Sequence, residues 1–579
     1  MESHRGPLNA QEGKTLAGAE NQDNSRDVIA GLEHKTITIG RDMSVSEHTT
    51  ADAKPEATAK QESSSHQDTP SNKRTWQFWL VFLSLCVLAF TSALEGSIIT
   101  TALPAISLGL GIESSSDYVW LASAFTLAQT VVQPPTAQLC NIFGRRNPLL
   151  VAVAFFAIGS GVAGGANSAA MAIAGRAIQG LGSGGIYMLV DLIVCDLVSL
   201  RDRGTYLGIV LSTAAVGAII GPVLGGALAE ANWRWVFYIN VPTSGMVLVI
   251  AWFFLKLGRQ PSTWRQILLR IDWIGNALFL TSITSILLGL TFGGVVAPWS
   301  SYRVIVPLVL GSLGWVAFHV FEASRWCHEP SVPSQLFTNR TSLVGFFHAF
   351  NAAILLNWTI YFLPIYFQGV KSVSPLTSGI DTLPYNAFII VAAMIAGGIM
   401  SKTGKYRPVH SAGFAFLALG VFTAFGQGFL ATTILPAIQA ALPDSEIASA
   451  TGMYAFLRSF GFVWGVTVPL LIFNASFDSQ VLTISDAEVR QDLSGGRAYG
   501  AASLAHTTHP PAPVRAEIAS AYELALQTVW RVSIGFACLG FVVSFASVQL
   551  ELRKDAETEF GIDDEKKHAG SSGETDSVA

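Results

Sequence analysis

Two ionisable residues lie inside long apolar stretches of this chain, where a charge is costly. Glu95 lies in the stretch 78–103, roughly 13 Å from its end at 1.5 Å of helix per residue. Arg176 enters the stretch 170–195 at a similar depth. A carboxylate in a low-dielectric cavity takes up a proton more readily than one in water. This pattern predicts that Glu95 and Arg176 face one cavity, where Glu95 exchanges protons with a substrate. The alternatives are a structural ion pair and an acid that snorkels to the membrane interface.

Two further charges lie in apolar stretches. Asp191 lies towards the end of 170–195, and a carboxylate at that position could join a proton path. Arg458 lies in the stretch 446–473, where a guanidinium either anchors a helix or lines a cavity. Of these, we assign Asp191 to proton coupling together with Glu95 and Arg176.

A third set of polar residues is suited to binding. The stretch 342–367 mixes amide and aromatic side chains, a lining that fits large, flat, poorly charged molecules. Interfacial aromatic residues would account for some of them equally well. We expect the substrate cavity to be lined by Gln179, Asn351, Asn357, Tyr361 and Arg458.

The segment VGAIIGPVLGG, residues 216–226, weakens a helix. In water each interior glycine costs about 1 kcal/mol and a proline about 3 kcal/mol. In lipid, small residues let backbones approach closely. Gly217, Gly221 and Gly225 are spaced by four and share one helix face, while Pro222 permits a kink and Gly226 follows. The segment predicts either tight packing or a sliding, bendable helix contact.

Signatures of enzymes are absent from the sequence. It contains no GxxxxGK[ST] loop for nucleotides, no HExxH, and no GxSxG with a plausible triad. The five cysteines are scattered without metal-ligand spacing. We therefore expect no catalytic residues, no metal, no cofactor and no ATP-driven step.

The composition is that of a membrane protein. Of 579 residues, 50% are hydrophobic and 13% are charged, whereas soluble domains carry about 25% charged residues. The mean hydropathy is +0.45, and the net charge of −5 gives no bias towards nucleic acid. Residues 1–74 and 553–579 are polar and poor in aromatics, so we expect two disordered cytoplasmic tails. The partner of the remainder is the lipid bilayer.

Apolar windows of about 20 residues mark the membrane spans. Twelve are visible: 78–103, 117–139, 149–167, 170–195, 206–229, 235–256, 273–292, 303–322, 342–367, 378–400, 446–473 and 529–550. The run 409–442, between the tenth and eleventh windows, is long for one crossing and short for two.

Basic residues orient these spans, because cytoplasmic loops are rich in Lys and Arg. They follow the second, fourth, sixth, eighth and tenth windows, which places the N-terminus in the cytoplasm. If 409–442 crosses twice, with a break at Gly426-Gln427-Gly428, there are fourteen spans and the C-terminus is also cytoplasmic. The loop 474–528 then lies outside, with a predicted glycosylation site at Asn474.

Two turns of the chain repeat each other. AQLCNIFGRRNP (137–148) and GIMSKTGKYRP (398–408) align on Gly144 and Gly404, and Arg145 then matches Lys405. Glycine permits a tight turn, while the cations, including Arg146, would face a helix C-terminus and the anionic leaflet. Repeated halves with a cavity between them are typical of secondary transporters.

These motifs carry a family resemblance over about residues 76–550. They are the Gly-Arg-Arg turn, ALEGSIITTALP (93–104), GRAIQGLGSGG (175–185), VGAIIGPVLGG and NWRWVFYINVP (232–242). Together they resemble the fourteen-span drug:proton antiporter branch of the major facilitator superfamily, in particular fungal efflux pumps for drugs and toxins. The chain departs from the family pattern at Glu95 and Asn141, each an aspartate in the family, and at Ala137, a glycine there. The run 409–442 is shorter than in typical members.

The resemblance implies an all-α polytopic membrane protein with two six-helix bundles and two extra linking helices. The N-terminal bundle would occupy 75–257, the linking helices 258–324, and the C-terminal bundle 325–552. If Asn141 replaces an aspartate that pairs across the halves, the lock on the outward-facing state is weaker in this chain.

The implied function is proton-coupled export of hydrophobic small molecules by alternating access. We expect a monomer in the plasma membrane, with a vacuolar membrane as the alternative location. Three other functions stay open at this stage: import of siderophores, vacuolar transport of basic amino acids, and ligand sensing without transport.

Overall fold

The computed structural model describes residues 75–112, 115–255, 270–294, 297–327, 329–420, 422–502 and 510–552. Every secondary-structure element named among these residues is a helix, which confirms the all-α prediction for this part of the chain. The predicted tails 1–74 and 553–579 lie outside the described residues, which all belong to one compact unit.

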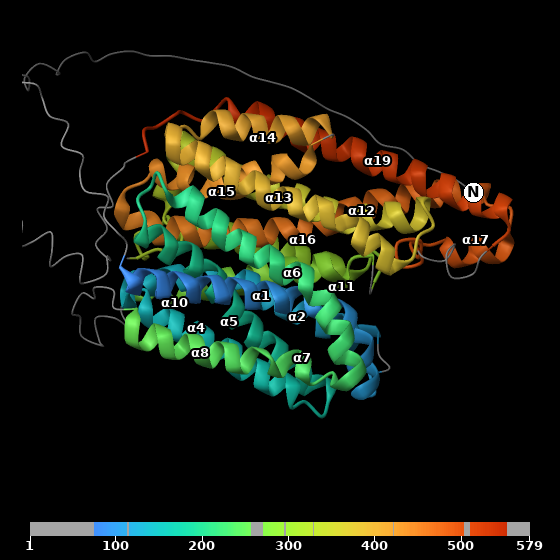
Figure 1. Cartoon of the computed structure of the whole chain (residues 1–579), viewed down its shortest axis with the longest axis horizontal. Helices are drawn as coiled ribbons and strands as arrows, with labels where there is room; N and C mark the ends of the chain where they lie inside the picture. The colour runs from blue at the N-terminus through green and yellow to red at the C-terminus, as the bar shows by residue number, and fades with distance from the viewer. Residues whose placement is uncertain are drawn as a thin grey trace, which may run out of the picture. The chain divides into compact units, whose positions relative to one another are not determined.

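The first group of helices comes from the N-terminal half of the chain. It comprises α1 (Trp76–Gly109), α2 (Ser115–Val131), α3 (Gln133–Phe143), α4 (Arg146–Gly164), α5 (Ala169–Leu197), α6 (Arg203–Asn232), α7 (Trp235–Tyr238) and α8 (Asn240–Phe254). Helix α6 packs along α1, and α5 packs against both α2 and α4 (Figure 1).

The second group comes from the C-terminal half. It comprises α12 (Arg340–Ile365), the π-helix η2 (Tyr366–Val370), α13 (Pro375–Thr403), α14 (Arg407–Leu419), α15 (Thr423–Ala440), α16 (Ile447–Gln480), α17 (Ala487–Leu493) and α19 (Ala512–Ser544). Between the groups in sequence lie α10 (Trp273–Phe292) and α11 (Tyr302–Glu322), which pack on each other. Helix α10 also contacts α2 and α16, so it touches both groups.

Eleven helices among the described residues are long and apolar enough to cross a membrane. Two of the expected regions are not among them: the second window and the run 409–442, which was expected to cross twice. The second window forms α2 and α3, which meet at Val132 just before Gln133-Pro134-Pro135. Proline has no backbone N–H and cannot continue the hydrogen-bond ladder, so the helix restarts there.

The run 409–442 forms two short helices, and the predicted position of the break is wrong. Helix α14 ends at Leu419, because Gly420 adopts the left-handed conformation (φ +70°) that terminates helices. Gly426 lies inside α15, where an added Cβ would lie 2.6 Å from the carbonyl oxygen of Gly413 on α14. Gly426 therefore serves close packing of the two helices. At 13 residues, α14 is about 20 Å long, less than the roughly 30 Å of a bilayer core.

The predicted loop 474–528 is also shorter than expected. Helix α16 runs on to Gln480 and α19 begins at Ala512, so both extend beyond their apolar windows. Their extensions pack on each other through aromatic rings, with Phe477 and Tyr522 centroids 4.8 Å apart. This packing stabilises helical turns that hydropathy does not mark. Asn474 consequently lies within α16 and is half-buried, while its glycosylation stays a prediction.

Helix α6 packs its glycine face against α1. A Cβ on Gly217 would clash with the carbonyl oxygen of Phe90, and one on Gly225 with that of Ile98. A Cβ on Gly226 would meet nothing within 4 Å, so this glycine is not part of the contact. The helix stays continuous through Pro222, whose carbonyl accepts a hydrogen bond from Thr101 Oγ1 at 2.9 Å.

The second group repeats this arrangement. Helix α16 packs on α12, and Cβ atoms on Gly461 and Gly465 would lie 2.6 and 2.5 Å from carbonyl oxygens of α12. The matched turns agree only in part, because Gly144 (φ +76°) and Gly404 (φ +68°) both have positive φ, but only Gly404 is in the left-handed helical conformation. The glycine-mediated helix contact, rather than the turn, is what the two groups share.

The α1–α6 contact predicts a difference between two glycines of one helix. Gly217→Ala should destabilise the protein by about 1–3 kcal/mol, because the added methyl group meets a backbone that cannot move aside alone. Gly226→Ala is the matched control and should leave stability unchanged or raise it by up to about 1 kcal/mol. Thermal unfolding of both variants in detergent measures this. Equal melting temperatures would show that the contact is not tight.

Candidate functional site

Glu95 and Arg176 form a buried ion pair between α1 and α5. Arg176 Nη1 donates a hydrogen bond to Glu95 Oε1. The Arg176 side chain is 1% exposed and the Glu95 side chain 0%. The second carboxylate oxygen accepts a hydrogen bond from Asn240 Nδ2 at the start of α8. The carboxylate thus links three helices of the first group.

The ion pair belongs to a larger buried network. Arg176 Nη1 also donates to Gln179 Oε1 at 2.8 Å, and Gln179 Nε2 donates to Ser160 Oγ at 2.7 Å. The guanidinium lies 4.4 Å from the ring centroid of Phe125. Gln179 is fully buried in this network, whereas the sequence placed it on the wall of a substrate cavity.

Asn240 is a member of the network to which the sequence assigned no role. It lies in the NWRWVFYINVP motif, directly after the apolar run WVFYI. An amide at that position is the feature of the sequence that could have marked it as a candidate. Asn240 Oδ1 and Arg176 Nε have no hydrogen-bond partner among the described residues. These two atoms are free to take new partners when the network changes.

A second ion pair connects the two groups of helices. Arg458 Nη2 on α16 lies 3.1 Å from Asp191 Oδ2 on α5. The guanidinium also lies 5.1 Å from the ring centroid of Tyr454. The two charges are 267 positions apart in the sequence (458 − 191), and their pairing was not predicted.

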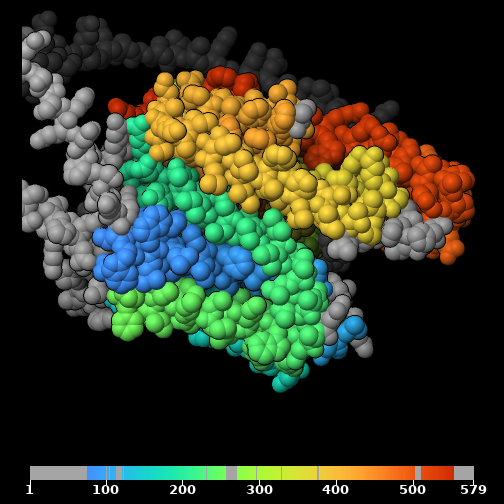
Figure 2. Space-filling view, in the orientation of Figure 1, coloured from blue at the N-terminus to red at the C-terminus, as the bar shows by residue number. Residues whose placement is uncertain are grey.

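Other polar contacts between the groups gather near one end of the helices. We call this the basic end, because the connections α3–α4, α5–α6 and α13–α14, which carry Arg145, Arg201 and Lys405, meet there. The contacts include Asn141 with Ser449 (3.2 Å), Gln133 with Ser459 (3.0 Å), Arg203 with Gln439 (2.8 Å) and Ser401 with Asp202 (2.6 Å). Figure 2 shows the two groups in contact at the left and separating towards the right.

The Gly144 turn differs in part from expectation. Arg145 Nη1 donates to the carbonyl of Cys140 in the last turn of α3, as a cation at a helix C-terminus should. However, Arg145 is buried and pairs with Asp196 at 2.9 Å, so it does not face the leaflet. Arg146 lies instead over the ring of Trp252, and Lys405 in the matching turn is exposed.

The two departures from the family pattern near this turn lie against α16. Asn141 makes its hydrogen bond across the groups to Ser449, so a neutral contact stands where an aspartate would put a charge. Ala137 lies against Gly452, where an added Cβ would clash with the alanine methyl group. The small residue that permits close approach is therefore on α16.

The remaining cavity candidates lie in the second group. Asn351 Nδ2 donates to the carbonyl of Phe536 on α19, and Asn357 Nδ2 to that of Phe462 on α16, each at 2.9 Å. Both amides thereby hold helices together within the group. Tyr361, 41% exposed, is the candidate of this set that is most available to a ligand.

The buried ion pair predicts strongly non-additive effects on stability. Arg176→Met alone should destabilise the protein by about 3–5 kcal/mol, because it leaves the Glu95 carboxylate buried and unpaired. Adding Glu95→Gln should recover a large part of that loss, since no charge then remains. Thermal unfolding of wild type, the two single variants and the double variant gives a double-mutant cycle that measures the coupling of the two residues. Additive losses would contradict the pairing.

Most of this chain is similar to known proteins. The family model described as Major Facilitator Superfamily matches residues 85–466. The MFS efflux transporter aclA of Aspergillus oryzae is 47% identical over 521 residues, which cover 86% of this chain and 94% of the relative. The MFS-type efflux pump LUC4 of a Fusarium species is 43% identical, with 85% and 91% covered. The efflux pump FUS6 of Gibberella fujikuroi is 42% identical, with 90% and 97% covered.

The family model matches more than half of the chain, and the similarity to these fungal pumps spans most of both sequences. The family predicted from the motifs is thereby confirmed. The fold, with two related groups of helices, agrees with it. This chain belongs to the major facilitator superfamily of membrane transporters.

Proposed function

We propose that this protein is a proton-coupled secondary transporter that exports hydrophobic small molecules by alternating access. The observation that carries the proposal is the buried Glu95–Arg176 pair, a charge-balanced carboxylate at the junction of three helices. Relatives named as efflux pumps support export over import. A plasma-membrane location fits the export of toxic compounds from the cell.

The basic end is assigned to the cytoplasm, because loops rich in Lys and Arg stay on that side. Both chain termini are cytoplasmic in this assignment. The contacts between the groups then close the cytoplasmic side, and the arrangement is outward-facing. Conversion to the inward-facing state requires the Asp191–Arg458 pair and the Asn141–Ser449 hydrogen bond to break.

Protonation of Glu95 is the step that couples protons to this conversion. A proton on the carboxylate removes the negative charge that Arg176 compensates and weakens the hold of α5 on α1. Arg176 keeps Gln179 Oε1 as an acceptor, so its guanidinium is not left without a partner. Proton uptake from outside and release inside would drive substrate outwards.

The glycine contact between α1 and α6 gives this step a mechanical route. Glu95 lies on α1, between the turns that meet Gly217 and Gly225 of α6. A contact made through glycine has no interlocked side chains, so one helix can shift along the other at low cost. A change at Glu95 can thus alter how α6 lies against the second group, which it contacts through α13.

Replacing the coupling carboxylate should separate binding from proton drive. In proteoliposomes loaded with rhodamine 6G, Glu95→Gln should abolish pH-gradient-driven transport, because the amide cannot exchange a proton. Exchange of labelled for unlabelled dye without a gradient should persist. The control is Glu523→Gln, an exposed carboxylate on α19, which should behave as wild type. Full gradient-driven transport by Glu95→Gln would remove this residue from the mechanism.

Breaking the ion pair between the groups should shift the conformational equilibrium. Asp191→Asn should increase the population of the inward-facing state, because an attraction specific to the outward-facing state is lost. Distances between spin labels on α3 and α16, measured by pulsed electron resonance, report this shift. The exchange Asp191→Arg with Arg458→Asp should restore the wild-type distribution. Identical distance distributions for Asp191→Asn and wild type would refute the gating role.

A further inference from the structure

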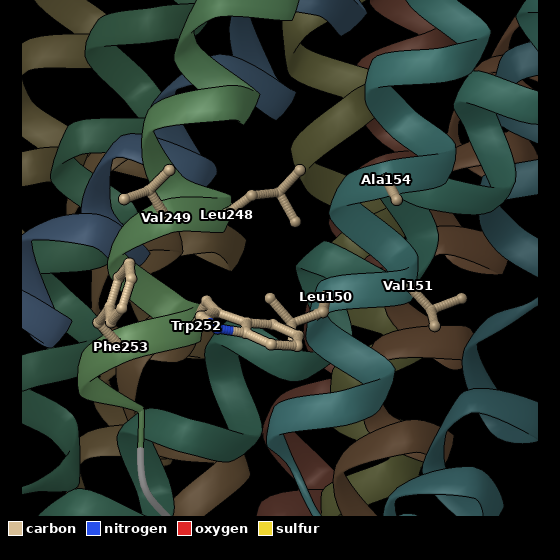
Figure 3. A pocket seen from close by; sticks show the side chains of 7 residues that line it. All are labelled: Leu150, Val151, Ala154, Leu248, Val249, Trp252 and Phe253. Carbon is tan, nitrogen blue, oxygen red and sulfur yellow. The ribbon is translucent and has the colours of Figure 1, made fainter.

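An apolar groove lies on the outer surface of the first group, between α4 and α8. Its volume is about 470 Å³. Leu150, Val151 and Ala154 line it from α4, and Leu248, Val249 and Trp252 from α8 (Figure 3). Val151, Val249 and Trp252 are each more than half exposed. The groove therefore opens towards the surroundings of the protein, which in a membrane transporter is lipid.

A fixed positive charge stands at the basic end of this groove. Arg146, the first residue of α4, has its guanidinium 5.0 Å from the ring centroid of Trp252. It also donates a hydrogen bond to the carbonyl of Trp252 through Nη2. The indole thus forms part of the apolar lining and holds the cation in place.

No carboxylate in the described part of the chain forms an ion pair with Arg146. Its Nε has no hydrogen-bond partner among the described residues. Its neighbour Arg145 is buried and paired with Asp196. Two consecutive arginines therefore divide their roles, with one holding α3, α4 and α5 together and the other presenting a charge beside an apolar groove.

We infer that the groove binds an anionic phospholipid of the cytoplasmic leaflet, with one acyl chain against Leu150, Ala154 and Leu248 and the phosphate at Arg146. From Arg146 to Ala154 the helix rises about 12 Å, which spans the headgroup boundary and the upper part of the chain. Tryptophan prefers this interfacial level, and basic residues there attract anionic lipids. The inference uses the orientation proposed above and is independent of proton coupling.

The chemistry of the groove favours lipid over other occupants. A free phosphate ion would not use seven apolar side chains, and a neutral substrate would not use an uncompensated arginine. A membrane helix of a partner would leave the charge of Arg146 unanswered unless it carried an acid at that depth. A lipid with an anionic headgroup satisfies both features at once.

Photocrosslinking tests the site on the full-length protein. The protein is reconstituted in phosphatidylcholine nanodiscs that contain phosphatidylserine with a photoreactive acyl chain, and adducts are mapped by peptide mass spectrometry. We expect adducts on residues 150–154 and 248–253. Arg146→Gln should reduce them by about fivefold, the effect expected for one basic residue at the membrane surface. A photoreactive phosphatidylcholine should label the same residues less and without dependence on Arg146.

Two steric variants provide the matched comparison. Leu150→Trp fills the groove, into which Leu150 points (Figure 3), and should abolish the adducts, while Val316→Trp places the same side chain on an exposed position of α11 and should leave them unchanged. Unfolding temperatures identify any variant that fails to fold. If a tryptophan variant fails, the crosslinking of Arg146→Gln is the test of the lipid site. Equal labelling by the two lipids, unaffected by Arg146→Gln, would overturn the inference, as would crosslinks between two copies of the chain at these residues.

Discussion

A lipid bilayer does not drive helices together, because its acyl chains are as apolar as the helix surfaces. The helices of this protein are held instead by close backbone contact, and glycine is what permits it. Gly217 on α6 brings that helix against the carbonyl groups of α1, and Gly461 brings α16 against α12 in the same way. These two contacts help to position one member of each interior ion pair, because α1 carries Glu95 and α16 carries Arg458.

The two interior ion pairs are built for different tasks. Glu95 and Arg176 lie within one group of helices, out of reach of solvent, with an amide at each side of the pair. Asp191 and Arg458 lie between the groups and are partly accessible. A charge change in the first pair alters how helices of one bundle hold each other, whereas a change in the second alters how the bundles meet. Such a separation fits the proposed coupling of a proton to a movement of the bundles.

Two adjacent arginines also differ in their surroundings. Arg145 and Arg146 are adjacent in sequence, yet one is compensated by Asp196 in the interior and the other lies uncompensated beside apolar side chains. Consecutive side chains at the start of a helix point in different directions around its axis, so Arg145 points inwards and Arg146 outwards. The basic turn therefore has two parts: Arg145 packs the interior, and Arg146 lies on the outer surface beside Trp252.

Sequence alone determined the features that lipid imposes locally: the apolar windows, the shared glycine face of residues 217–225, the repeated Gly144 and Gly404 turns, and the family. It also placed Glu95 and Arg176 at one depth, since depth follows from counting residues along a helix. Tertiary structure alone decided which groups meet, including Asn240 with Glu95, Asp191 with Arg458 and Asn141 with Ser449. It also set the extension of α16 and α19 beyond their windows. The contacts depend on neighbours far away in the sequence, and the extensions depend on aromatic packing between the two helices, so local hydropathy carries no information about either.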